Sequence, residues 1–164
     1  MDLNKFTQKC QEAVASAQST AVEHGHYEID VEHLLVSLLK QTDGLVPRIL
    51  KKMDVRLDDL TTASEALLTK KPSVSGPGYD KDRILITQRL NKLFIQAEKE
   101  AQRLKDEYVS VEHLFLLIVR EGTSSGAGKV LKEYNVNEDQ FLKALTDIRG
   151  NQRVQSANPE QTYE

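Results

Sequence analysis

Two glutamate–histidine pairs carry the side chains most capable of chemistry in this sequence. Both occur as Val-Glu-His-Leu, at residues 31–34 and 111–114. An imidazole beside a carboxylate could serve a metal or an acid–base reaction, but a metal site needs several converging ligands, such as two histidines four residues apart on a helix. Each pair holds one histidine, and the other two, His24 and His26, flank Gly25. This spacing predicts hydrogen bonding and helix capping, and no metal site.

A glycine-rich segment at residues 122–130 imitates a phosphate-binding loop. Such a loop has four residues between its first glycine and a Gly-Lys pair, and a serine or threonine then holds magnesium. Here five residues separate Gly122 from Gly128-Lys129, and Val130 follows the lysine. A helix is expected before this segment, where the nucleotide loop requires a strand. The segment therefore predicts an ordinary connection without nucleotide binding.

The remaining reactive side chains also have structural explanations. Cys10 is the only cysteine, which excludes an internal disulfide, and it falls on the apolar face of a predicted helix, as a small core residue would. Asp58-Asp59 is typical of a solvated helix start. The spacing supports no serine, histidine and aspartate arrangement. We therefore expect no catalytic residue and no enzyme activity in this chain.

The sequence repeats itself over a long period. Phe6-Thr7-Gln8-Lys9 returns 80 positions later as Ile86-Thr87-Gln88-Arg89, the shift that also relates the two Val-Glu-His-Leu segments. Further along, Ile49-Leu50 returns as Val130-Leu131, at a shift of 81. A period this long indicates duplication of a unit of several helices. Two such units predict a pseudo-symmetric surface with a groove where they meet, which favours binding over chemistry.

Apolar periodicity and capping residues predict the elements that position these side chains. Thr7 and Thr87 are expected to cap the first helix of each unit, and Asp30 and Ser110 the second. The second helices are strongly apolar and should be the most buried. The predicted helices cover 6–24, the segment between Asp30 and Gly44, 46–53, 57–70, 86–104, the segment between Ser110 and Gly122, 127–134 and 137–149.

No strand pattern appears, so the predicted fold is all-α, with about eight helices in two pseudo-symmetric four-helix repeats. We place repeat one at 1–70, an irregular connector rich in glycine and proline at 71–82, and repeat two at 83–150. The polar residues 151–164 are expected to form a linker. Together, residues 1–150 should make one domain.

Composition excludes several classes of function. The net charge is −3 and no basic patch with interleaved aromatics occurs, so nucleic acid is not an expected partner. The N-terminal residues carry no apolar signal region, and no apolar run reaches the length that spans a membrane. With one cysteine and no targeting signal, a reducing cytoplasm is the expected location.

The paired Val-Glu-His-Leu helix starts, each preceded by an alanine-striped helix, resemble the Clp repeat, the duplicated N-terminal module of Hsp100/Clp AAA+ unfoldases. The resemblance covers roughly residues 1–150. Within that family the chain looks most like the ClpB-type disaggregase branch, because of Leu3-Asn4-Lys5-Phe6-Thr7, Asp106-Glu107-Tyr108-Val109-Ser110 and Arg149-Gly150-Asn151-Gln152-Arg153-Val154. The last residues resemble the linker that enters the first ATPase domain.

The resemblance implies a domain that binds exposed apolar segments of misfolded or aggregated polypeptides and delivers them to the pore of a chaperone hexamer. Matched by position, the family's functional surface corresponds to Thr7, Asp106 and Glu112, with Glu32 as a secondary binding residue. The full-length protein is expected to be a homohexamer that cooperates with an Hsp70 system, and the isolated domain a monomer. ATP and magnesium are expected only in the ATPase domains, and no cofactor in this chain.

The alternative is the ClpC-like N-domain of a protease-linked unfoldase, which docks adaptors and phosphorylated arginine. Those domains show Gly-Thr-Glu-His at both helix starts, whereas this chain has Asp30-Val31 before Glu32 and Ser110-Val111 before Glu112. The two glutamates could pair with a guanidinium group. They could equally be solvated residues of a first helical turn, where the helix dipole favours negative charge.

Overall fold

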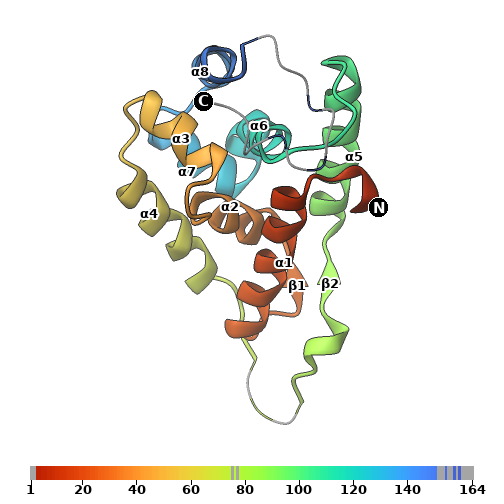
Figure 1. The fold of residues 1–164 in the computed structure, drawn as a ribbon. Coiled ribbons are helices and arrows are strands. Elements are labelled where there is room, and N and C mark those ends of the chain that lie inside the picture. Colours follow the sequence, from red (N-terminus) through yellow and green to blue (C-terminus); the bar gives the residue numbers. More distant parts are fainter. Residues whose placement is uncertain are drawn as a thin grey trace.

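The computed structural model describes residues 3–74, 76, 78–150, 154, 157 and 159. Within these residues the chain forms eight α-helices, three short 3-10 helices and two short strands (Figure 1). In chain order they are η1 (Leu3–Lys5), α1 (Gln8–Glu23), β1 (Glu28–Ile29), α2 (Val31–Leu39), α3 (Leu45–Lys52), α4 (Leu57–Thr69), η2 (Lys81–Arg83), β2 (Leu85–Ile86), α5 (Gln88–Arg103), α6 (Val111–Glu121), η3 (Gly122–Ser124), α7 (Gly126–Glu133) and α8 (Glu138–Arg149).

Helix boundaries follow the predicted caps. Thr7 precedes α1 and its hydroxyl oxygen accepts a hydrogen bond from the Cys10 N–H at 3.2 Å, while Thr87 does the same for Leu90 at 3.1 Å. These bonds satisfy amide groups that a helix cannot pair internally, so they set where each helix begins. The predicted all-α class with eight helices is confirmed. Cys10 is fully buried in the core, as expected.

The second helix of each repeat forms the centre of the molecule. Every residue of α2 is buried, and so are eight consecutive residues of α6, Val111–Ile118. The two helices pack against each other and are surrounded by the remaining helices of both repeats. Buried side chains from the two repeats form one continuous apolar core. The prediction that α2 and α6 are the most buried helices is therefore confirmed.

The two repeats are interlocked crosswise. The closing helix of the first repeat, α4, packs on α7 of the second, and the closing helix of the second, α8, packs on α3 of the first. The backbone shows the same exchange. β1 pairs in parallel with β2, and Phe6 forms a parallel bridge with Val109. Each repeat thus completes the other, and the core cannot be divided between them.

The expectation of no strand is wrong for β1 and β2, although each has only two residues. A strand this short cannot display an alternating pattern, so periodicity does not reveal it. The pairing arises because the extended residues before α2 and α5 meet when the repeats interlock. The Thr87 hydroxyl donates to Asp30 Oδ1 at 3.0 Å and fastens the two helix starts together.

The connector between the repeats is held at Gly25. The Val74 N–H donates to the Gly25 carbonyl at 2.8 Å. Gly25 has a φ of +66°, and a Cβ atom there would lie 2.2 Å from the Val74 carbonyl oxygen. Both the left-handed backbone and the close approach therefore require glycine.

Gly25→Ala should lower the free energy of unfolding by about 2 kcal/mol, because a Cβ would push the connector off α1 and strain the backbone. Gly78→Ala is the matched control, since a Cβ at Gly78 meets nothing within 4 Å. Urea unfolding followed by circular dichroism measures both. Equal stability of the two variants would contradict the close packing of the connector.

Candidate functional site

Both central helices begin with a histidine that completes a capping box. The backbone N–H of Asp30 donates to His33 Nδ1 at 2.9 Å, and that of Ser110 donates to His113 Nδ1 at 2.8 Å. Because each Nδ1 accepts a hydrogen bond, each neutral ring carries its proton on Nε2. The predicted role of these histidines in capping is confirmed. The hydrogen-bond partner of Nε2 differs between the two repeats.

In the second repeat, His113 Nε2 donates to Asp106 Oδ2 at 2.8 Å. The other carboxylate oxygen accepts from the Arg149 guanidinium at 2.6 Å and from the Val154 N–H at 2.9 Å. Burial alone would raise the pKa of Asp106, but these three donors outweigh it and lower the pKa from 3.8 to about 2. Asp106 is therefore a buried anion that joins α6, α8 and the start of the tail.

Glu112 belongs to the same buried group. It accepts a hydrogen bond from the Ser110 hydroxyl, and its Oε2 lies 3.5 Å from an Arg149 nitrogen. That contact is within ion-pair distance but lacks hydrogen-bond geometry, so Oε2 has no hydrogen-bond partner among the described residues. Glu112 is 1% exposed, and the idea of a solvated first-turn residue is wrong for it. Arg149 faces two carboxylates and compensates their charge.

The first repeat places different side chains in the same positions. His26 occupies the place of Asp106, 80 positions earlier, and its Nδ1 accepts from His33 Nε2 at 2.8 Å. Lys71 takes the role of Arg149, with its Nζ 3.3 Å from Glu32 Oε2 and 3.6 Å from Asp30 Oδ2. Glu32 is also buried, which again excludes the solvated alternative.

The paired histidines of the first repeat are held neutral. Burial, the charge of a protonated His26 and the nearby Lys71 together lower the pKa of His33 from 6.5 to about 4, against a smaller opposing effect of Asp30. Burial, and then the charges of His24 and Lys71, also lower the pKa of His26. A protonated His26 is thus disfavoured, whereas His24 caps α1 through a 2.9 Å bond between its Nδ1 and the Thr20 carbonyl.

Thr7 lies on the opposite side of the same backbone bridge. Its N–H donates to the Val109 carbonyl at 2.9 Å, and Val109 stands between Asp106 and Glu112 in the sequence. The structure thus gathers three of the predicted binding residues around one segment, while Glu32 lies apart from them, at the start of α2. All four are buried, so a bound polypeptide could be affected by them only through the residues that cover them. Their contribution to polypeptide binding stays a prediction.

The sequence did not reveal Arg149, His26 or Lys71 as parts of these clusters. The repeat offers one signal for His26, since it aligns with Asp106 at the shift of 80. Arg149 lies 43 positions after Asp106 and gave no local signal. Its role follows only from the docking of α8 beside α6.

A groove of about 430 Å³ runs between α5 and α6. Arg120 spans its rim and donates to Glu100 at 2.9 and 3.1 Å, and also to Glu138. Hydrogen bonds from Arg103 and Arg120 lower the pKa of Glu100 to about 2. The groove is lined by Gln96, Lys99, Glu100, Arg103, Leu117, Arg120 and Glu121.

The side chains that could bind a metal ion are spread over the described part of the chain. No group of three or more histidine, cysteine, aspartate or glutamate side chains there is arranged to hold a metal ion. The glycine-rich segment follows helix α6 and forms η3 and the start of α7, as expected for an ordinary connection. Among the described residues, no helix is both long and apolar enough to cross a membrane.

Comparison with known proteins relates this structure to one family. The profile of the Clp repeat (R) N-terminal domain matches residues 5–134. The chain is 46% identical over 164 residues to the chaperone protein ClpB of Nitratidesulfovibrio vulgaris, which is all of this chain and 19% of that protein. The ClpB of Bacillus cereus strain ATCC 10987 matches with the same identity and the same shares. The chain thus spans about a fifth of the length of these relatives.

Solved structures share the fold. The crystal structure of the Hsp104 N-terminal domain from Candida albicans superimposes with a TM-score of 0.81 at 20% identity, over 95% of this chain and 99% of that one. A ClpV N-domain in complex with a VipB peptide gives a TM-score of 0.62 at 18% identity, over 88% and 86% of the two chains. At these identities the likeness establishes the fold alone.

The neutral histidine pair makes stability depend on pH. Between pH 6.5 and 4 the unfolded chain binds more protons at His33 than the folded chain does, so stability is complete above this range and falls as the pH decreases through it. The loss should amount to about 3 kcal/mol. In His33→Gln, glutamine can still complete the capping box but does not titrate. Chemical denaturation at several pH values should show a much smaller slope for the variant, and an unchanged slope would contradict the assignment.

Asp106→Asn should lower the free energy of unfolding by about 3 kcal/mol, because it removes one of the two carboxylates that compensate the buried Arg149. Asp58→Asn is the control, since Asp58 is exposed in the first turn of α4 and its loss should cost about half a kcal/mol. Thermal and urea unfolding compare them. Similar stabilities of the two variants would show that the buried charge of Arg149 does not need Asp106 to compensate it.

Proposed function

Because the chain belongs to the Clp repeat N-terminal domain family, we propose that it is the polypeptide-engaging N-terminal domain of a ClpB-type chaperone. The single observation that carries this proposal is similarity along all 164 residues to ClpB chaperones from several bacteria. The clients are misfolded or aggregated polypeptides with exposed apolar segments. The domain binds these segments and delivers them to the pore of an ATP-driven hexamer.

The physical properties of the domain suit this task. Its buried charges are already compensated by partners within the fold, so the described residues are organised for rigidity rather than for reaction. Unfolded clients lose conformational freedom on binding, which keeps the affinity of one domain weak. Six tethered domains in a hexamer raise the local concentration and add avidity.

The rest of the proposed machine lies beyond this chain. We place ATP and magnesium in ATPase domains that follow the tail, and cooperation with an Hsp70 system in the cytoplasm. The tail would act as the linker to the first ATPase domain. Most of the predicted linker, 151–164, and the predicted boundary at Gly150 fall outside or at the edge of the described residues. The division into repeats at 1–70, 71–82 and 83–150 stays a prediction.

The geometry disfavours the alternative of phosphoarginine docking. The Glu112 carboxylate already faces the guanidinium of Arg149, and Glu32 already faces Lys71. An external guanidinium would have to displace a buried basic side chain from each carboxylate. Adaptor docking elsewhere on the surface does not depend on these glutamates.

The proposal is tested by NMR shift mapping of the domain titrated with a soluble, permanently unfolded protein and, separately, with free phosphoarginine. Binding of the unfolded protein without a response to phosphoarginine is expected. A stably folded protein of similar size is the control and should cause no shifts, because its apolar segments are buried. A response to phosphoarginine alone, centred on Glu32 and Glu112, would establish the protease-linked alternative. The absence of chemical-shift changes with both ligands would overturn the proposed function.

A further inference from the structure

The crosswise pairing creates two equivalent strand edges. Phe6 pairs with Val109 just before α1, and Ile86 pairs with Ile29 just before α5. Phe6 and Ile86 correspond at the repeat shift of 80, as do Ile29 and Val109. The extended segments at Phe6 and Ile86 lead into α1 and α5. One edge of each segment pairs with Val109 or Ile29, and the other edge faces away from that partner. The two edges should therefore offer similar backbone groups to anything that approaches them.

The tail of the chain covers one of these edges. The Glu107 N–H donates to the Val154 carbonyl at 2.7 Å, and the Gln8 N–H donates to the Ala157 carbonyl at 2.8 Å. The two donors flank the Phe6–Val109 bridge on either side, so the tail reaches both partners of the bridge. Val154 is fully buried, and Phe6 is only 1% exposed. On the outer edge of the Phe6 segment, the tail thus accepts one backbone hydrogen bond, from Gln8, and the Phe6 carbonyl accepts a hydrogen bond from the Gln11 side chain at 3.0 Å.

The equivalent edge at β2 is open. Leu85 and Thr87 direct their N–H groups to β1, to the carbonyls of Tyr27 and Ile29, so the N–H and carbonyl of Ile86 point to the other side. No described residue bonds to these two groups or to the N–H of Gln88. In Figure 1, β2 borders the molecule, and no labelled element lies along its outer side.

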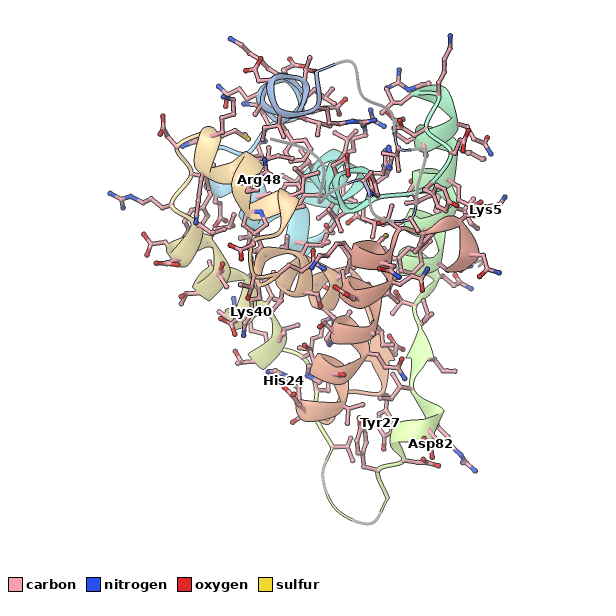
Figure 2. The ribbon with its side chains drawn as sticks, in the orientation of Figure 1. Lys5, His24, Tyr27, Lys40, Arg48 and Asp82 are labelled. Atoms are coloured by element: carbon pink, nitrogen blue, oxygen red, sulfur yellow. The ribbon has the colours of Figure 1, made fainter. Side chains whose placement is uncertain are left out.

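Exposed apolar side chains lie on β2 and beside β1. Leu85 is 68% exposed, Ile86 42% and Tyr27 47%, and they are three of the four large apolar side chains that stand out from the described surface. Figure 2 shows Tyr27 at this end of the molecule, and its ring lies 5.9 Å from that of Tyr79. Of the charged neighbours, Arg83 is paired with Asp80 at 3.4 Å. An unpaired strand edge with exposed apolar side chains is a template for pairing with another chain, and soluble proteins normally block it.

We propose that the β2 edge binds an extended, apolar polypeptide segment of a client, much as the tail binds the Gln8 N–H on the equivalent edge beside Phe6. The client would pair its backbone with the N–H and carbonyl of Ile86 and with the N–H of Gln88, and would lay apolar side chains on Leu85 and Ile86. This inference rests on the proposed function and assigns it a location. Strand addition selects unfolded clients, because a folded protein seldom offers a free extended backbone.

The test uses a fluorescent short peptide of alternating valine and leucine, flanked by solubilising residues, and the permanently unfolded protein. Binding is measured by fluorescence anisotropy and by NMR. Ile86→Pro removes the outward N–H without removing a hydrogen bond of the fold, and Leu85→Lys places a charge on the edge. Ile95→Lys is the matched control, because Ile95 is a similar side chain on α5, 48% exposed and nine positions beyond Ile86.

Both edge variants should weaken the peptide's affinity by roughly tenfold, as expected for the loss of one or two net hydrogen bonds and their apolar contacts. Ile95→Lys should bind as the unaltered domain does. The same peptide with alternate backbone nitrogens methylated cannot complete the hydrogen-bond ladder. Its affinity for the unaltered domain should therefore be as low as the affinity of the unmethylated peptide for the edge variants. The Ile86 and Gln88 amides should shift on binding.

Two results would overturn the inference, and they differ in what they mean for the function. If the unfolded protein binds equally well to Leu85→Lys, Ile86→Pro and the unaltered domain, the edge is not the site, although the proposed function stands. If neither the peptide nor the unfolded protein binds the unaltered domain, both the site and the function fall. Unchanged amide shifts at Thr7 and Val109 would confirm that the variants keep the fold.

Discussion

The crosswise backbone pairing of the two repeats is the constraint on which the rest of the structure depends. Because Phe6 pairs with Val109 and Ile86 with Ile29, the start of each repeat is fixed to the middle of the other. The central helices α2 and α6 are thereby brought together inside one core. Buried side chains of both repeats therefore form one continuous core.

The buried charges of each repeat lie beside these pairings and follow the same symmetry with different chemistry. In the second repeat Asp106 accepts from His113 and Arg149, and the anion is held by donors from α6, α8 and the tail. In the first repeat His26 stands in that position, and a neutral histidine pair replaces the ion pair. The same position in the repeat thus holds a buried anion, Asp106, in the second repeat and an uncharged hydrogen-bond acceptor, His26, in the first. The lowered pKa values of His33 and His26 make the first repeat sensitive to mild acid.

Much of the fold could be read from the sequence, because helix caps and apolar stripes are local. Thr7, Thr87, Asp30 and Ser110 mark the helix starts correctly, and the repeat shift shows that the units match. The crosswise pairing could not be read in this way, since a repeat shift does not state which unit completes which. The burial of Glu112 could not be predicted either. An acidic residue in the first turn of a helix is normally expected to be solvated, and only the docking of α8 places Arg149 beside it.

The two equivalent strand edges differ in that the chain's own tail binds beside one of them, at Gln8 and Glu107, whereas no described residue bonds to the other, at Ile86 and Gln88. Native-state hydrogen exchange of the free domain measures this difference most directly. It should show protected amides at Gln8 and Glu107, which donate to the tail, and rapid exchange at Gln88 and at the outward amide of Ile86. Equal protection at the two edges would contradict the account, because it would mean that the β2 edge is already covered or that the tail does not bind.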